Sequence, residues 1–282
     1  IGLGIPAEPL FRSSYVSARR ADFGKIAKAC GISPVLARLI RNRGAVGEHE
    51  TEQFLRGTLD DLRDPSLLPD IRKGAGIIME ANRNGAKIRV IGDYDVDGIC
   101  SSYILWRTIT MLGGRVDAVL PDRIRDGYGI NERLVCEAAK EGITLIVTCD
   151  NGIAAAQPLQ TAMDKGIRVV VTDHHEIPYT CSADGSKCFQ LPPAEAVINP
   201  KRPDEETGVP PYPFPEICGA VVAYKLCQIL LETAQSPESA QAAEELLPFC
   251  ALATVCDVMP LKDENRIIVR EGLKRASNPC NT

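Results

Sequence analysis

Residues 87–102 read KIRVIGDYDVDGICSS, and this stretch decides the fold class. It begins with apolar and β-branched residues and then places Asp93, Asp95 and Asp97 at alternate positions. A short apolar run of this kind, followed by turn residues, is typical of a strand buried in a sheet. Like charges two residues apart repel, and burying one carboxylate without a partner is costly. We therefore expect positive charge at the end of this strand.

Four further runs share this β-branched composition, and helical segments alternate with them. The predicted strands are KIRVIGD, RVDAVLPD, TLIVTCD, RVVVTDH and AEAVIN, and the predicted helices are SSYILWRTITMLGG, NERLVCEAAKEG and AAAQPLQTAMDKG. A glycine closes each of these helices, which is a common C-terminal stop. Continuous apolar strands that alternate with helices predict an α/β fold: a doubly wound, mostly parallel sheet with helices on both faces.

The chain on either side of this alternation has a different composition. Residues 1–84 carry helical patterns interrupted by glycine and proline, so we predict an N-terminal helical region followed by a second domain over residues 85–282. The segment Tyr179–Pro215 is rich in proline and polar residues. It is predicted to be an insertion that contains the strand AEAVIN, and its part in binding is left open.

The bulk composition is that of an ordinary globular protein, with 45% apolar and 24% charged residues. No apolar run is long enough to cross a bilayer, and the first residues lack the features of a signal peptide, which indicates a cytoplasmic protein with no membrane partner. The net charge of −5 does not by itself indicate a nucleic-acid binder. A cluster of metal-binding carboxylates would, however, make the metal-free chain acidic.

The cysteines argue against a secreted disulfide scaffold. There are eleven, an odd number, and no CxxC pair occurs. Cys181 and Cys188 share one polar loop, where a bridge or a metal site is a minor alternative.

Acidic and histidine side chains follow three of the predicted strands. They are Asp93, Asp95, Asp97, Asp150, Asp173, His174 and His175. Ligands of open α/β sheets bind outside the carboxyl ends of the strands, so these side chains are expected at one edge. Asp257, inside the apolar stretch ATVCDVMPL, adds a fourth contribution.

Each of these residues has an ordinary structural explanation when taken alone. Asp150 or Asp257 could cap a helix or turn, and the histidine pair could be a polar loop. The stretch 93–98 faintly resembles a calcium loop, but the ligand spacing and the closing glutamate are missing. Together the residues favour a metal centre. Oxygen ligands with one or two imidazoles suit Mn²⁺ or Mg²⁺, and about four to six ligands suit two ions.

Four motifs, in this order, resemble those of the DHH phosphoesterase superfamily. They are GDYDVDG (92–98), TCDNGI (148–153), TDHHE (172–176) and ATVCDVMPL (253–261). Within the superfamily the chain is most similar to RecJ-type single-stranded-DNA-specific exonucleases. The similar stretches outside the motifs are LARLIRNRG, DLRDPSLLPDI, PDRIRDGYGIN, VINPKRP and CGAVVAYKL. The resemblance implies a DHH phosphoesterase core for the predicted sheet.

The resemblance also implies a role for each motif residue. The metal ligands would be Asp95, Asp97, Asp150, His174 and Asp257, with Asp150 bridging two ions. Asp93 would be a further ligand or an orienting base.

Four other residues would act around these ligands. Asp173 would orient a histidine. His175 would face the scissile phosphate. Arg123 and Arg125 would pair with substrate phosphate, for which the planar guanidinium is suited, although a solvated loop charge is an equal alternative for Arg125.

The activity that the resemblance implies is hydrolysis of single-stranded DNA from its 5′ end, by water activated between two metal ions, in recombination and repair. The partners would be single-stranded DNA and other replication or repair proteins. Two alternatives remain. One is a DHH phosphodiesterase of short oligonucleotides or of cyclic or linear dinucleotides. The other is an inactive DNA- or protein-binding scaffold, which is disfavoured because every acidic and histidine position of the motifs is filled.

The resemblance to RecJ-type enzymes also implies a second domain after the catalytic one. That domain carries a glycine-rich, histidine-containing motif and holds the substrate as the second half of a clamp. This chain has no such motif and reads ASNPCNT at its last residues. We therefore expect the catalytic domain without the clamp domain.

Overall fold

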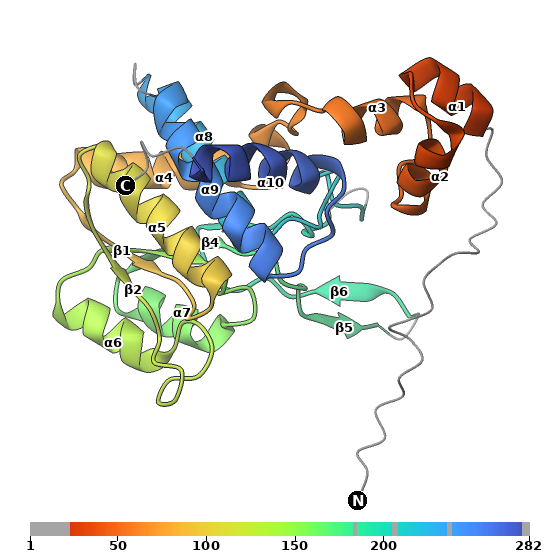
Figure 1. Ribbon diagram of the computed structural model, residues 1–282. Helices are drawn as coiled ribbons and strands as arrows, with labels where there is room; N and C mark the ends of the chain where they lie inside the picture. The colour runs from red at the N-terminus through yellow and green to blue at the C-terminus, as the bar shows by residue number, and fades with distance from the viewer. Residues whose placement is uncertain (1–22, 183–184, 205–207, 236–238, 278–282) are drawn as a thin grey trace, which may run out of the picture. The chain divides into compact units, whose positions relative to one another are not determined.

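The computed structural model describes residues 23–182, 185–204, 208–235 and 239–277 (Figure 1). The chain divides into two compact units, Ile1–Asp61 and Leu62–Thr282. The predicted boundary, between residues 84 and 85, differs from this division after Asp61. Residues 62–84 contain the short 3₁₀ helix η2 (Pro65–Leu67) and the helix α4 (Ile71–Arg83), and α4 packs on the sheet of the larger unit.

The smaller unit is helical in its described part. It contains α1 (Phe23–Cys30), α2 (Pro34–Asn42), α3 (Glu48–Arg56) and the short 3₁₀ helix η1 (Leu59–Asp61). Ser33 caps α2 by accepting a hydrogen bond from the backbone N–H of Leu36. Ile26, Cys30 and Ala37 are buried in a small core of its own.

The larger unit contains a five-stranded sheet in the order β2-β1-β3-β4-β7, and all four strand pairs are parallel. The strands are β1 (Lys87–Ile91), β2 (Arg115–Val119), β3 (Leu145–Cys149), β4 (Arg168–Thr172) and β7 (Ala196–Ile198). All five residues of β3 are buried, which explains its uninterrupted apolar run in the sequence.

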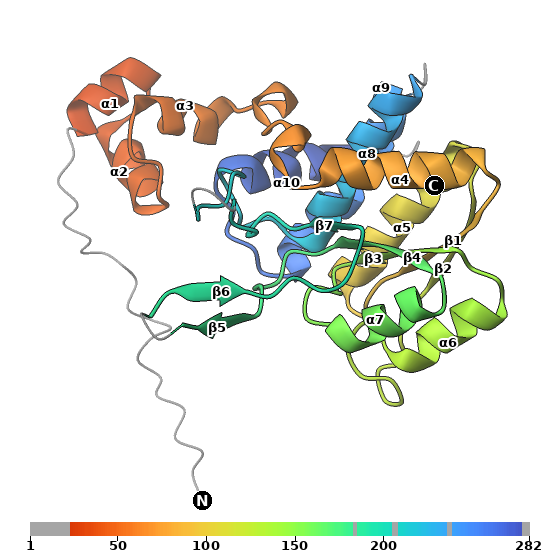
Figure 2. The ribbon, with the colours of Figure 1, turned by 180° about the vertical axis from the view of Figure 1, so that it is seen from behind.

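Helices cover both faces of this sheet (Figures 1 and 2). One face carries α4, α5 (Val96–Met111) and α8 (Gly219–Ala234), with α9 (Ser239–Cys256) and α10 (Asp263–Ala276) packed further out. The other face carries α6 (Glu132–Lys140) and α7 (Ala156–Asp164), where Leu134 and Leu159 pack with Ile146 and Val169 in one buried cluster. The predicted doubly wound α/β fold is confirmed.

The insertion that was predicted around β7 contains a hairpin that the sequence did not indicate. Its strands are β5 (Tyr179–Cys181) and β6 (Lys187–Phe189). Cys188 lies opposite Thr180 and Cys181 lies opposite Lys187, so the two thiols point to opposite faces of the hairpin. Both cysteines are free, and the disulfide alternative was wrong.

Within the described residues, no helix combines the length and the apolar character needed to cross a bilayer.

Candidate metal centre

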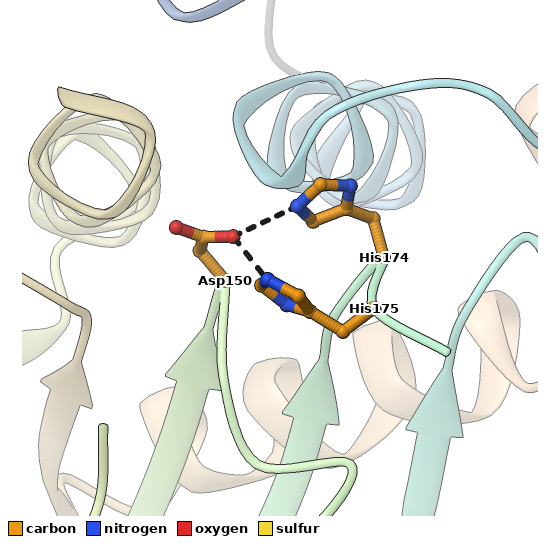
Figure 3. A group of neighbouring side chains, drawn as sticks. All are labelled: Asp150, His174 and His175. Atoms are coloured by element: carbon orange, nitrogen blue, oxygen red, sulfur yellow. Dashed lines mark ion pairs between the residues drawn. The ribbon is translucent and has the colours of Figure 1, made fainter. Parts of the chain in front are cut away.

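The carboxyl ends of β3 and β4 deliver three of the predicted side chains to one place. Asp150 follows β3, and His174 and His175 follow β4 (Figure 3). The Nε2 atom of His174 lies 3.1 Å from Asp150 Oδ1. His175 approaches the same oxygen, with its Nδ1 3.9 Å away. The parallel register of the two strands therefore places a carboxylate between two imidazoles.

Two helix ends complete the cluster around His174. Asp97 lies in the first turn of α5, and its Oδ2 is 3.5 Å from His174 Nε2. Asp257 follows the last residue of α9, and its Oδ2 is 3.7 Å from the same nitrogen. The sequence predicted Asp257 inside a helix, whereas it lies just beyond the helix end. That end carries partial negative charge, so a carboxylate there is unfavourable unless a cation accompanies it.

Local structure explains how the loop after β1 reaches the site. Asp95 is the N-cap of α5 and accepts a hydrogen bond from the Gly98 N–H over 2.9 Å. A side chain on Gly98 would meet the backbone of Asp93 at about 2.5 Å, so this tight turn requires glycine. The three alternating aspartates thus occupy three different environments: a strand end, a helix cap and a buried helical turn.

The backbone at Asp150 is held in the left-handed region, with φ at 60°. Its carbonyl oxygen accepts a hydrogen bond from the Tyr128 hydroxyl over 2.6 Å. Its N–H donates to the carbonyl of Thr172 over 3.1 Å. Asn151 fixes the same turn by donating to the carbonyls of Ile91 and Cys149. These bonds aim the Asp150 side chain away from the sheet and toward His174.

Burial and like charge govern the protonation of the cluster. Burial raises the pKa of Asp150, and the neighbouring charges of Asp97 and Asp95 raise it further. Burial also raises the pKa of Asp257. Burial lowers the pKa of His174 despite the carboxylates around it, which favours its neutral form. A cation at this position would lower the pKa values of both aspartates, and the neutral imidazole of His174 is the form that binds a metal ion.

The donor set fits a divalent cation. Two groups of ligand atoms lie within 4.8 Å of one another: Asp150, His174 and His175 form one, and Asp97, His174 and Asp257 form the other. Among the described residues, Asp150 Oδ1 and His174 Nδ1 are buried without a hydrogen-bond partner. Carboxylate oxygens with an imidazole are ligands that suit Mn²⁺ and Mg²⁺.

Asp173 hydrogen-bonds the histidine pair and lies outside both groups of candidate ligand atoms. Its Oδ1 accepts from the backbone N–H groups of His174 and His175 and pairs with His175 Nδ1 over 2.8 Å. Its Oδ2 accepts from the Ile153 N–H. Burial would raise the pKa of Asp173, but these hydrogen bonds and the charge of His175 outweigh it and lower the pKa. The histidine side chain that Asp173 contacts is His175, and its orienting role stays a prediction.

Two predicted residues lie beside the two groups of ligand atoms. Asp93 is fully buried, with Oδ1 accepting from the Gly129 N–H, and burial raises its pKa. Asp95 is exposed at the start of α5, and its charge acts on Asp150 and Asp257. The ligand roles of Asp93 and Asp95 stay predictions.

The loop before α6 places aromatic rings next to the histidines. The Tyr128 ring packs edge-on against both His175 and Tyr94, and the Arg123 guanidinium lies 5.2 Å from the centre of the Tyr94 ring. Arg125 is exposed, and its backbone N–H donates to Asp122. Sequence reasoning missed both tyrosines, although Tyr94 lies in the motif GDYDVDG and Tyr128 lies in the similar stretch PDRIRDGYGIN.

A pocket of about 420 Å³ opens beside this group. Tyr128, Asn151, Ile153, Pro158 and His175 line part of it. The half-exposed imidazole of His175 lies on one side of this pocket, and apolar side chains form other parts of its wall. A pocket of this composition suits a ligand with both charged and flat apolar parts.

The chain belongs to the DHH family, because the model of the N-terminal domain of that family matches residues 87–254. The chain is 35% identical over 244 residues to the single-stranded-DNA-specific exonuclease RecJ of Bacillus subtilis (strain 168), covering 86% of this chain and 28% of that protein. It is 37% identical over 251 residues to RecJ of Dickeya dadantii (strain 3937), covering 86% and 40%.

Solved structures show the same likeness. A crystal structure of exonuclease RecJ bound to manganese is 33% identical, with a TM-score of 0.60, and the match covers 74% of this chain and 48% of that one. RecJ of Thermus thermophilus in complex with Mn²⁺ is 29% identical, with a TM-score of 0.66, and the match covers 90% and 33%. The chain thus spans less than half the length of these relatives.

Proposed function

We propose that this chain is the catalytic domain of a RecJ-type exonuclease that hydrolyses single-stranded DNA with divalent metal ions. The observation that carries the proposal is the convergence of three carboxylates on His174 Nε2, within 3.1–3.7 Å. A cation would stabilise a buried cluster with this excess of carboxylates, and the relatives named RecJ supply the substrate class.

Asp97, Asp150, His174 and Asp257 would hold two ions, of Mn²⁺ or Mg²⁺, with the predicted ligand Asp95 at the open side. Bound there, such ions supply an acidified water and neutralise charge on the phosphate oxygens. Asp150 Oδ1 lies 3.1 Å from His174 Nε2, and both side chains are buried, so we expect their loss to weaken binding most.

His175 would serve the phosphate directly. Its hydrogen bond to Asp173 raises its pKa, which favours the protonated imidazole more than in a free histidine. Its side chain is 46% exposed, so the charge is accessible beside the ligands. A phosphate oxygen would accept a hydrogen bond from this ring as negative charge builds on it. Asp173 holds the ring in place.

Arg123 and Arg125 would neutralise phosphates at the mouth of the site. Both are exposed on the loop whose Tyr128 contacts His175. Charge contacts of this kind act on the DNA backbone and read no sequence. We therefore expect cleavage without sequence preference. Cleavage from the 5′ end, in repair and recombination, is what the resemblance to RecJ-type exonucleases implies. Action on chromosomal DNA, in concert with other replication or repair proteins, would place the protein in the cytoplasm.

The test is hydrolysis by the purified 282-residue chain with and without Mn²⁺. The substrates are end-labelled single-stranded DNA, the matching duplex and a dinucleotide, and Asp150→Ala is the control. We expect metal-dependent release of 5′-mononucleotides from the single strand alone, and none from the control.

Two other results would each replace the proposal. Cleavage of the dinucleotide alone would indicate a DHH phosphodiesterase of short substrates. Binding of the single strand without cleavage, although Mn²⁺ is bound, would indicate a scaffold.

A further inference from the structure

Two backbone N–H groups at the start of α8 hold one of the candidate ligands. The Gly219 N–H donates to Asp97 Oδ2 over 2.6 Å, and the Ala220 N–H donates to Asp97 Oδ1 over 2.8 Å. N–H groups in the first turn of a helix have no partner inside the helix, and they carry partial positive charge. Asp97 is 2% exposed, so these two bonds fix its orientation.

Gly219 also lies against a second ligand. A Cβ at position 219 would stand 2.7 Å from Asp150 Cβ, 2.9 Å from Asp150 Oδ1 and 3.0 Å from Asp97 Oδ2. Real Cβ atoms essentially never approach other heavy atoms closer than 3.0 Å. Asp150 cannot easily move away, because it is 1% exposed and Tyr128 and Thr172 bond its backbone.

The backbone conformation does not explain a glycine at this position. Gly219 is the first residue of a regular helix, where any residue has acceptable dihedral angles. The explanation lies in the crowding against Asp150. The oxygen that a Cβ would approach, Asp150 Oδ1, is also a buried atom without a hydrogen-bond partner among the described residues. The unpartnered Asp150 Oδ1 therefore borders the space that a side chain at position 219 would fill.

We propose that Gly219 is a positioning residue of the metal centre. Its N–H orients Asp97, and its missing side chain leaves Asp150 in the position from which it binds a cation. This inference rests on the metal binding given under Proposed function. It adds a residue that lies outside the acidic and histidine motifs.

The first test is calorimetric titration of the 282-residue chain with Mn²⁺, in comparison with Gly219→Ala. We expect this substitution to raise the Kd at least ten-fold, as is typical when the support of a ligand is lost. Gly272→Ala is the matched control, because its Cβ would be equally crowded, 2.5 Å from Ala251 Cβ, but between α9 and α10. It should lower Tm and leave the Kd unchanged. Gly76→Ala, which meets nothing within 4 Å, should do neither.

A second test needs no metal. Position 150 has a φ of 60°, which glycine adopts readily, so Asp150→Gly removes the crowding without straining the turn. In EDTA, Gly219→Ala should lower Tm in the wild-type background and lower it much less in the Asp150→Gly background. An equal loss of Tm in both backgrounds would mean that Gly219 serves packing elsewhere, and the inference would be wrong.

The outcomes separate this inference from the proposed function. Wild-type protein that binds no Mn²⁺ would overturn both. Wild-type protein that binds Mn²⁺ with the same Kd as Gly219→Ala would overturn the inference and leave the proposed function standing. A Kd at least ten-fold higher for Gly219→Ala, with the Kd of Gly272→Ala unchanged, would support both the inference and the proposed function.

Discussion

Two clusters of buried charge in the larger unit differ in how their charge is balanced. In the first, Glu264 is fully buried, its Oε2 lies 2.9 Å from Lys225 Nζ, and the Tyr212 hydroxyl donates to its other oxygen. In the second, Asp97 and Asp150 are almost as deeply buried, but their basic neighbour is His174, whose pKa burial lowers. The first cluster supplies its own cation. The second leaves negative charge that must be balanced from outside the chain.

The difference shows how a structural charge cluster is distinguished from a functional one. Burial lowers the pKa of Lys225, but the charge of Glu264 opposes this shift. The Lys225 ammonium also donates a hydrogen bond to the carbonyl of Arg63. The Lys225 ammonium and both carboxylate oxygens of Glu264 therefore have partners. At the metal centre, Asp150 Oδ1 and His174 Nδ1 have no hydrogen-bond partner among the described residues. An unpaired buried carboxylate oxygen such as Asp150 Oδ1 is costly, and a bound cation would offset that cost.

Breaking the balanced cluster should have the largest effect on stability. Lys225→Met keeps the length of the side chain but leaves the buried carboxylate of Glu264 without a cation. We expect the free energy of unfolding to fall by about 3–5 kcal/mol, the usual cost of removing one partner of a buried ion pair. Urea denaturation measures it. Lys225→Met with Glu264→Gln is the control and should recover most of the loss. If the single variant were as stable as wild type, the cluster would not be a balanced pair.

A bound metal ion should balance the negative charge of the second cluster, as Lys225 balances that of the first. At a Mn²⁺ concentration about 100 times the Kd, the free energy of unfolding should rise by about 2.7 kcal/mol. The same denaturation series with added Mn²⁺ or with EDTA measures this increment. Asp150→Asn should lose most of it, whereas Lys225→Met with Glu264→Gln should keep it. An increment that survives in Asp150→Asn would place the bound ion elsewhere.

The pH dependence of the metal-free protein should report the unbalanced charge. Asp150 and Asp257 have raised pKa values in the folded state, so the unfolded chain loses these protons first. The stability that these two groups contribute is therefore fully present below the ordinary aspartate pKa of about 4 and is lost as pH rises toward the raised values. Between about pH 5 and pH 8 in EDTA, we expect wild type to lose roughly 1–2 kcal/mol more than Asp150→Asn. Equal slopes for the two proteins would contradict this account.

The sequence predicted the sheet and most of the metal cluster for a simple physical reason. Strands buried on both faces, such as β3, leave continuous apolar runs, and parallel strands bring the residues after them to one edge. Asp150 and His174 could therefore be placed together from pattern alone.

Other parts of the site depend on contacts that no local pattern encodes. Gly219 is one of 23 glycines, and it meets Asp97 across 122 residues of chain. In the sequence, nothing distinguishes Tyr128 from other loop residues. In the fold, its hydroxyl donates a hydrogen bond to the carbonyl of Asp150. The hairpin strands β5 and β6 were missed because each has three exposed residues, too few to show any periodicity.

The two clusters can also be compared by the backbone strain at one residue of each, which has a smaller effect on stability. Asp263, beside Glu264 in the balanced cluster, and Val258, beside Asp257 at the metal centre, both have a left-handed backbone, with φ of 47° and 55°. Asp263 offsets this cost because its Oδ1 accepts a hydrogen bond from the Glu264 N–H. Val258 is β-branched, 86% exposed and has no polar atom to offer.

Val258→Gly should therefore raise the free energy of unfolding by roughly 1 kcal/mol, since glycine adopts this conformation without strain, although its unfolded chain is more flexible. Asp263→Gly should lower it, because the substitution removes both the hydrogen bond to Glu264 and the ion pair with Arg63. Urea denaturation in EDTA measures both variants under the same conditions. If Val258→Gly were destabilising as well, the exposed valine would make contacts that outweigh its strain. The two clusters would then differ in the balance of their charge but not in the strain of the backbone that carries it.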